Sequence, residues 1–352
     1  MLYAPLPRTL PAALRDVREA KAAVRASAVG DLARHAQSTR SDADRNAIVE
    51  AVVAALADEA PMVREAAAEA LGDTRSTEAL PALLVAVEDD DPIVRQKAIA
   101  ALGELGDARA QSRLERALSD ARPEVRFQAV MAFPRVTTSR STASIALARA
   151  ARDKDEHVAY VALRMGEELA AASDEPLDPA LLDVARERLR HPSARLRAVA
   201  AVLLGAAHDR AGVEVIRSLV RGDLTTDEPE DLAEALLLAG DLGLRDLTRA
   251  LEKRAFRGFL GLMRDPFAWH ARTALARLGH ARATEAILDE LRRGTATAIE
   301  AAERARVKAA LPLLRTLIAS HPDTPRELVL RAIAAIETAS DSLSTHDPQE
   351  AP

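Results

Sequence analysis

Residues 91–107 read DPIVRQKAIAALGELGD, and this stretch decides how the chain folds. Apolar side chains recur at the three- and four-residue spacing of one helix face, at Ile93, Val94, Ala98, Ala101 and Leu102. Asp91 and Pro92 are typical of the start of a helix. Gly103 and Gly106 are typical of its end. The spacing therefore predicts a helix over residues 92–103.

A second helix is expected to follow, because Asp107 can cap it and a new apolar face begins there. That face consists of Ala110, Leu114, Ala117 and Leu118. Two such helices cannot bury their apolar faces alone, so copies of the pair must stack. The copies exist: Val94-Arg95 recurs as Val63-Arg64 and Val125-Arg126, 31 residues to either side. Weaker copies begin at residues 24, 158 and 196, and residues 267–291 align without gaps on 94–118.

The pattern Asp-Pro-x-Val-Arg-x-x-Ala-x-x-Ala-Leu-Gly-x-Leu-Gly-Asp in residues 91–107 resembles bacterial HEAT repeats. The resemblance is to the short type named after phycobilisome lyases, and it is strongest over residues 61–135 and 267–291. It implies an all-α fold, an α-solenoid in which antiparallel helix pairs form a right-handed superhelix. It also implies that the second helices of the pairs (76–88, 107–119 and 140–152) line the concave wall.

A polar, Pro-containing stretch at residues 172–178 separates two halves of this solenoid. Residues 1–174 form an N-terminal HEAT-repeat half, and residues 175–340 form a degenerate C-terminal half. Residues 341–352 have no apolar period, and we expect them to be disordered. The acidic stretch 223–242 and the Gly-broken stretch 255–266 depart from the repeat, so the solenoid is expected to bend or break there.

The composition agrees with closely packed helices and excludes several chemistries. Hydrophobic residues make up 48% of the 352 residues, but aromatic residues only 2%. Because there is no Cys, disulfides, thiolate nucleophiles, Cys-type zinc sites and iron–sulfur clusters are excluded. The net charge of −6 argues against a chain that binds nucleic acid over its whole surface. The sequence shows neither a membrane span nor a signal peptide, and we expect a cytoplasmic monomer.

The most regular polar feature is an Arg that follows the repeated apolar residue, at positions 25, 64, 95, 126 and 197. We expect these arginines to be structural, bonding an Asp or carbonyl groups of the adjacent turns. The acidic run 88–91 lacks the spacing of a calcium loop and suits the start of a helix. No two His residues have the spacing of a helical metal site, and phosphate-loop and Gly-x-Ser-x-Gly motifs are absent. We therefore expect no catalysis and no cofactor.

Two local clusters are the candidates for binding a partner. Residues 180–222 contain eight arginines and only four acidic residues. The candidates among these arginines are Arg186, Arg188, Arg190 and Arg195. The solvated or internally neutralised interpretation is preferred for this run, because the acidic stretch 223–242 follows directly. Four of the eight aromatic residues lie close together, and three of them are candidates: Phe256, Phe259 and Trp269. Trp269 aligns with Gln96, so it is the candidate for an exposed ring.

The preferred hypothesis is a non-catalytic scaffold or adaptor that binds another protein, along the concave groove or in the region 180–270. One alternative is a cofactor-handling protein, because the short repeat type resembles the bilin lyases and isomerases, which attach a tetrapyrrole to a protein. The lack of Cys and the scarcity of aromatic rings argue against it. The other alternative is nucleic-acid binding by a basic solenoid face, which the adjoining acidic stretch disfavours.

Overall fold

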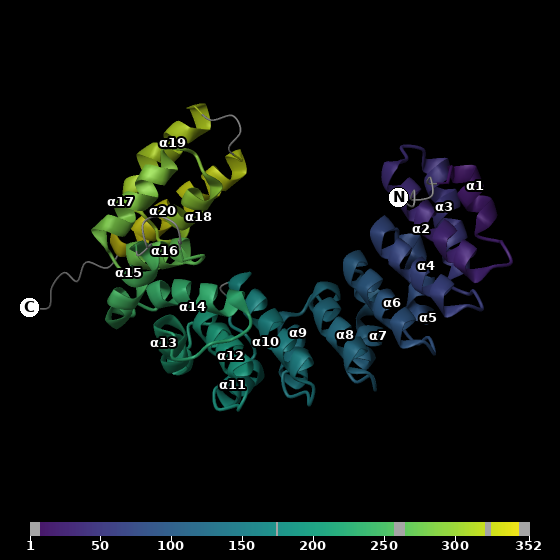
Figure 1. Cartoon of the computed structure of the whole chain (residues 1–352), viewed down its shortest axis with the longest axis horizontal. Coiled ribbons are helices and arrows are strands. Elements are labelled where there is room, and N and C mark those ends of the chain that lie inside the picture. Colours follow the sequence, from purple (N-terminus) through teal and green to yellow (C-terminus); the bar gives the residue numbers. More distant parts are fainter. Residues whose placement is uncertain (1–7, 174, 257–264, 321–324, 345–352) are drawn as a thin grey trace, which may run out of the picture. The chain divides into compact units, whose positions relative to one another are not determined.

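The computed structural model describes residues 8–173, 175–256, 265–320 and 325–344, and within these ranges the chain is helical and contains no strand (Figure 1). The chain divides into two compact units, Met1–Val184 (unit 1) and Ala185–Pro352 (unit 2). The division lies inside helix α11 (Pro179–Arg188), whereas the sequence division was drawn after residue 174. Each unit is described by itself below.

Unit 1 is a succession of helix pairs joined by short turns. Its helices are α1 (Leu10–Asp16), α2 (Ala22–Ser38), α3 (Asp42–Ala55), α4 (Pro61–Thr74), α5 (Leu80–Ala86), α6 (Pro92–Leu105), α7 (Gln111–Ala117), α8 (Pro123–Val136), α9 (Arg140–Ala150) and α10 (Glu156–Ala171). Short 3-10 turns precede two of them, η1 (Thr77–Ala79) before α5 and η2 (Ala108–Ala110) before α7.

Unit 2 continues the same alternation. After the end of α11 it contains α12 (Ala194–Ala206), α13 (Val213–Arg221), α14 (Pro229–Asp241), α15 (Thr248–Phe256), α16 (Ala268–Arg277), α17 (Ala281–Leu291), α18 (Ala296–Arg304), α19 (Leu311–Ser320) and α20 (Arg326–Ser344). Its 3-10 turns are η3 (Arg210–Gly212), η4 (Arg245–Leu247) and η5 (Lys308–Ala310). The prediction of an all-α solenoid of helix pairs is confirmed in both units.

Helix α6 shows how local chemistry sets the ends of a repeat helix. The Asp91 carboxylate accepts hydrogen bonds from the backbone N–H groups of Ile93 (2.8 Å) and Val94 (3.4 Å), and Pro92 occupies the first turn. Gly106 ends the helix in the left-handed region, at φ +63°. The expected start of the helix is thus confirmed.

Gly103 does not end the helix as expected. It lies inside α6, and a Cβ atom built on it would stand 2.8 Å from Cβ of Ala132 on α8. A Cβ atom built on Gly72 of α4 would stand 3.2 Å from Cα of Ala101 on α6. These residues are small because the first helices of neighbouring pairs pack almost backbone to backbone.

The first helices of unit 1 (α2, α4, α6, α8 and α10) form a continuous row, in which each contacts the next along its length (Figure 1). The second helices (α3, α5, α7 and α9) pack on this row and make few contacts with one another. Because the closely spaced row of a curved stack lies on the inner side, the first helices and not the second line the concave side of this unit. The expectation that the second helices form the concave wall is therefore wrong, because the Gly–Ala contacts draw the first helices together.

The same row recurs in unit 2, where α12, α14, α16, α18 and α20 contact one another in order. The acidic stretch 223–242 was expected to interrupt the repeat, but it contains the regular helix α14. Most of the stretch 255–266 lies outside the described residues. Helix α20 runs to Ser344, four residues into the stretch 341–352 for which disorder is expected from the sequence. Residues 345–352 lie outside the described residues.

In the described part of the chain, no helix combines the length and the apolar character that crossing a membrane requires.

Candidate functional site

The repeated arginines of unit 1 form a ladder of ion pairs. Each guanidinium group holds the Asp that precedes the next first helix, in the pairs Arg25–Asp58, Arg64–Asp89, Arg95–Asp120 and Arg126–Asp153. The contacts are bidentate: in the Arg126–Asp153 pair both N–O distances are 2.7 Å. The four arginine side chains are at most 16% exposed.

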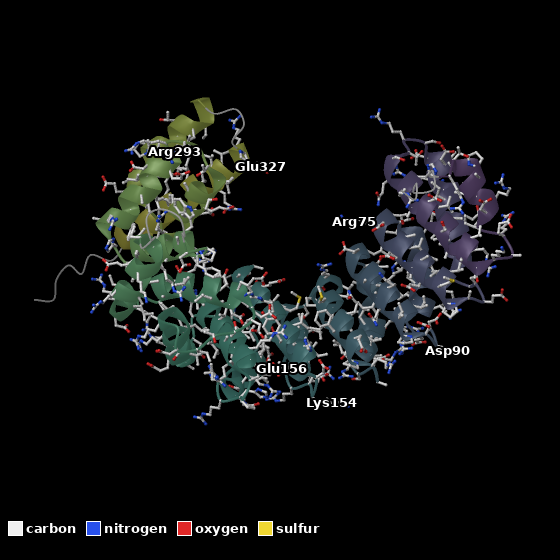
Figure 2. The ribbon with its side chains drawn as sticks, in the orientation of Figure 1. Arg75, Asp90, Lys154, Glu156, Arg293 and Glu327 are labelled. Carbon is white, nitrogen blue, oxygen red and sulfur yellow. The ribbon has the colours of Figure 1, made fainter. Side chains whose placement is uncertain are left out.

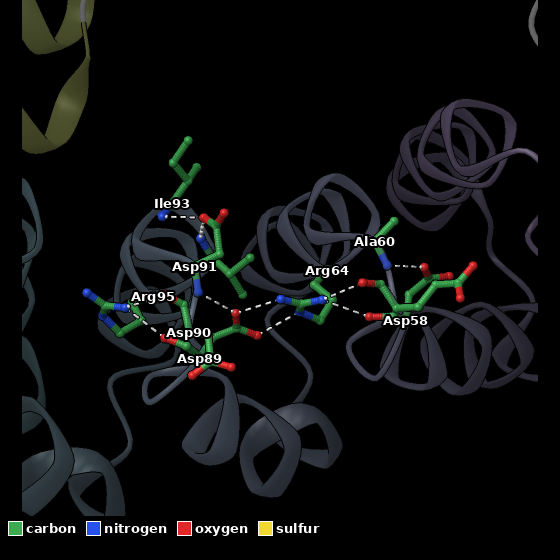
Figure 3. Close-up of polar contacts among 10 residues, drawn as sticks. Asp58, Ala60, Arg64, Asp89, Asp90, Asp91, Ile93 and Arg95 are labelled. Atoms are coloured by element: carbon green, nitrogen blue, oxygen red, sulfur yellow. Dashed lines mark hydrogen bonds and ion pairs between the residues drawn. The ribbon is translucent and has the colours of Figure 1, made fainter.

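The remaining N–H groups of each arginine bond backward along the chain (Figure 3). Arg64 donates through Nη1 to the carbonyl oxygens of Asp58 and Glu59, at 2.9 and 3.2 Å. Its Asp89 partner also accepts from the backbone N–H of Asp91, at 2.9 Å. Each arginine therefore ties the turn before its own helix to the turn before the next one. The structural interpretation is confirmed, because the N–H groups of these arginines bond to carboxylates and carbonyl oxygens of the same chain.

Three of the four residues in the acidic run 88–91 also bond within the chain. Glu88 pairs with Arg113 and Arg116, Asp89 with Arg64, and Asp91 caps α6. Asp90 is exposed, and Figure 2 places it at the opposite end of the helix layer from Arg75, which follows α4. Among the residues that the structure describes, no group of three or more His, Asp or Glu residues could hold a metal ion.

Four of the eight arginines in residues 180–222 are paired with carboxylates. Arg186 binds Asp209, and Arg195 binds Glu228 at 2.7 Å. Further along, Arg217 and Arg221 share Asp246, at 3.0 and 2.9 Å. Arg188 also has a polar partner, and Arg190 is exposed. The internally neutralised interpretation is thus supported: this run does not offer a row of free cations to a polyanion.

The aromatic cluster is held together by arginines. The guanidinium of Arg272 lies over the rings of Trp269 (5.1 Å) and Phe256 (5.7 Å), and that of Arg282 covers Phe256 at 4.1 Å. Phe256 and Trp269 also pack on the apolar core of unit 2. Phe259, the third aromatic candidate, lies outside the described residues. The structure therefore joins two of the candidates, Phe256 and Trp269, through Arg272.

A pocket of about 360 Å³ opens beside Trp269 in the row of first helices of unit 2. It is lined by Leu237 of α14; Trp269, His270 and Thr273 of α16; Thr297, Glu300, Ala301, Glu303 and Arg304 of α18; and Arg331 of α20. We call it the Trp269 pocket. Its apolar and aromatic lining comes from Leu237, Trp269 and Ala301, and its charged side chains come from α18 and α20.

The pocket arises from substitutions in the repeat. Helix α14 matches α4 position for position, because Gly240 approaches Ala274 as Gly72 approaches Ala101. On the solvent-exposed face of the row in unit 1, Glu69 of α4 pairs with Lys97 of α6 at 2.8 Å. The corresponding residues of unit 2 are Leu237 and His270. An ion pair that covers the surface in unit 1 is therefore replaced by a leucine and an imidazole that line the pocket.

His270 lies half-buried on α16, where its environment favours the neutral imidazole. Burial lowers the pKa of its imidazole from the ordinary value of 6.5, and the negative charge of Glu234 only partly opposes this. Its Nδ1 atom is buried and has no hydrogen-bond partner within the described residues. A buried ring nitrogen without a partner is costly, so it marks a point at which a ligand could form a hydrogen bond.

The charged side chains around the pocket differ in how firmly they are held. Glu303 accepts three hydrogen bonds from Arg331, at 2.9 to 3.2 Å, so both are engaged. Arg304 donates to Asp241 at 3.0 Å. Glu300 is exposed at the edge of the pocket. The lining can hold an apolar group against Leu237 and Trp269 and polar groups against the side chains of α18 and α20.

Sequence reasoning pointed to Trp269 but missed the other pocket residues. Leu237, Glu300, Arg304 and Arg331 come from three different helices, each in a separate repeat. Taken singly, each is an ordinary residue of a helical surface. The signal that could have found them is the alignment of α14 on α4, in which Leu237 stands in place of the charged Glu69.

Comparison with known proteins gives the class of the chain. A family model of HEAT repeats matches residues 9–92 and 81–166. The chain therefore contains HEAT repeats, which are recognised over most of unit 1. The helix pairs of unit 2 continue the same arrangement beyond the matched residues.

Three solved structures are similar in fold. An engineered protein of the Northeast Structural Genomics Consortium is 18% identical, with a TM-score of 0.44 over 93% of this chain and 98% of its own. The complex of CpcE and CpcF of phycocyanin lyase from Nostoc sp. PCC7120 is 18% identical, with a TM-score of 0.36 over 81% and 96%. A designed armadillo repeat protein in complex with the peptide (KR)4 is 20% identical, with a TM-score of 0.44 over 57% and 100%. No curated protein matches the chain.

Proposed function

We propose that this HEAT-repeat protein is a non-catalytic scaffold or adaptor and that it binds another protein at the Trp269 pocket. The observation that carries the proposal is the replacement of the Glu69–Lys97 ion pair by Leu237 and His270, beside the sole tryptophan of the chain. Partly exposed tryptophan in an apolar pocket is typical of the centre of a protein interface. The row of first helices presents the pocket on an extended surface, as repeat proteins do.

Photo-crosslinking tests the proposal. A photoreactive amino acid replaces Thr297, an exposed residue of the pocket, and in a matched control it replaces Gln128, the corresponding residue of α8 in unit 1. In the native extract we expect position 297 to crosslink one protein in a saturable manner, and position 128 not to. The proposal fails if both positions give the same products, or if the Trp269→Ala variant leaves the crosslink at 297 unchanged.

A further inference from the structure

The rim of the Trp269 pocket carries an arginine cluster that its counterpart in unit 1 lacks. Helix α18 matches α8, because the buried Ala298, Ile299, Ala301 and Ala302 stand where Ala129, Val130, Ala132 and Phe133 stand. In unit 1, Glu104 of α6 accepts hydrogen bonds from Arg75 and Arg135, at 3.2 and 2.5 Å. The corresponding residues of unit 2 are Arg277 for Glu104 and Arg304 for Arg135. Arg75 corresponds to Gly243, so the carboxylate of Glu104 is replaced in unit 2 by a guanidinium group next to that of Arg304.

The cluster consists of Arg277, Arg304 and Arg306, and two carboxylates serve it: Asp241, and Glu234 at 3.9 Å from Nη2 of Arg304. Asp241 lies 3.0 Å from Nη2 of Arg304 and 3.7 Å from Nε of Arg277. Burial and then the positive charge of Arg306 lower the pKa of the Arg277 guanidinium, which shows how closely the positive groups are held. The charges of this cluster are therefore incompletely balanced, and Arg304 connects it to the pocket.

We propose, on the basis of the protein-binding function above, that the partner is an acidic segment of a protein. It inserts a large apolar side chain over Trp269 and places a carboxylate against Arg277, Arg304 and Arg306. Planar guanidinium groups bind carboxylates with two parallel hydrogen bonds, and the half-buried position of Arg277 strengthens such contacts. Of the two carboxylates that line the described pocket, Glu303 is held by Arg331, so a basic segment would find Glu300 alone.

The backbone at Arg306 makes the proposal testable without loss of the fold. Arg306 has φ +53°, which is a left-handed conformation. In other turns of unit 2 glycines adopt this conformation, namely Gly243 (φ +68°) and Gly279 (φ +84°). Replacement by Gly removes the charge and also relieves strain, so Arg306→Gly should be at least as stable as the parent. Arg75→Gly is the matched control, because Arg75 has φ +49° after α4 of unit 1.

The probes are short blocked peptides that share a central pair of Leu residues and are flanked only by Glu, only by Gln or only by Lys. Trp269 is the single tryptophan of the chain, so its fluorescence reports directly on the pocket. We expect the Glu peptide to change this fluorescence saturably and to bind about tenfold more tightly than the Gln peptide. Its binding should weaken with added salt and in Arg306→Gly, but not in Arg75→Gly.

Three results would overturn the proposal: equal binding of the Glu and Gln peptides, tighter binding of the Lys peptide, or no response to any peptide. In the first two cases the pocket still binds a peptide, so only the acidic character of the partner is wrong. In the third case, the crosslink at position 297 decides separately whether the pocket binds a protein.

Discussion

Gly103 of α6 lies so close to Ala132 of α8 that a Cβ atom on the glycine would stand 2.8 Å from Cβ of the alanine. Such a distance is shorter than any normal contact between carbon atoms. Glycine is ordinarily a poor residue for the interior of a helix, so its presence here reflects the spacing of the two helices and not the local preference of the chain. The row of first helices depends on this contact and on its counterpart between Gly72 and Ala101.

The first prediction follows from this contact. Gly103→Ala should lower the free energy of unfolding by about 1–3 kcal/mol, because the added methyl group overpacks the contact with α8. Gly30→Ala in α2 is the control, since a Cβ atom there meets nothing within 4 Å. It should stabilise the protein by about 0.5–1 kcal/mol through helix propensity alone. Urea unfolding of both variants checks the opposite signs, and a stabilising Gly103→Ala would contradict the close packing.

The second prediction concerns the arginine ladder. Arg126→Ala should cost about 2–4 kcal/mol, because it leaves Asp153 half-buried without its partner and frees two carbonyl groups. Arg149→Ala removes an ion pair with Glu115 in which the two side chains are 64% and 50% exposed, so it should change stability by less than about 1 kcal/mol. Hydrogen exchange of α8 and α10 should report the loss locally. Equal effects of the two variants would show that the ladder adds nothing beyond surface pairing.

The third prediction is the acid sensitivity of unit 1. A hydrogen bond from Arg25 holds the pKa of the Asp58 carboxyl below its ordinary value of 3.8, although burial opposes this. Because the carboxylate is stabilised in the folded state, its contribution is complete above that ordinary value and disappears as the pH falls through the lower, folded pKa. Stability should thus be level near neutrality and decline below about pH 4. The Asp58→Asn variant should show a shallower decline in urea unfolding at each pH, and an unchanged slope would exclude this linkage.

The fourth prediction concerns His270. Burial holds its imidazole pKa below 6.5, so NMR titration of the histidine rings should find one signal that titrates lower than a free histidine. Loss of this signal in His270→Gln assigns it. Below pH 6.5 the unfolded chain binds the proton more readily than the folded one, so this group should reduce stability as the pH falls. A ring that titrates at or above 6.5 would place His270 in a solvated or acidic environment instead.

The helix pairs and the role of the arginines were predictable because both depend on neighbours in the sequence. The apolar spacing in residues 91–107 identifies one repeat, and an Arg six residues after a turn Asp can reach that turn whatever the rest of the fold does. Gly103 was misinterpreted because glycine has the same signature at a helix end and at a close helix contact. That distinction depends on the partner helix, which the local sequence does not contain.

Of the residues that line the Trp269 pocket, only Trp269 itself could be predicted from the sequence. Its other walls belong to α14, α18 and α20, and whether Leu237 and Ala301 face one cavity depends on how successive repeats stack. The same limit applies to the arginine cluster, because Arg277 is an ordinary residue at the end of a helix until Arg304 and Arg306 are placed beside it. The basic run 180–222 shows the reverse: its charges attract attention in the sequence, yet several are paired with acids in the fold.

The arginine ladder also determines how unit 1 would respond to a mechanical load. Each ion pair joins only two successive turns, so tension along the stack passes through Arg25–Asp58, Arg64–Asp89, Arg95–Asp120 and Arg126–Asp153 in series. When links bear the same tension in series, the weakest ion pair determines where the stack opens. Removal of one ion pair, as in Arg126→Ala, would leave the other three in place, so stretching should open the stack first at the altered repeat while the other repeats keep their shape.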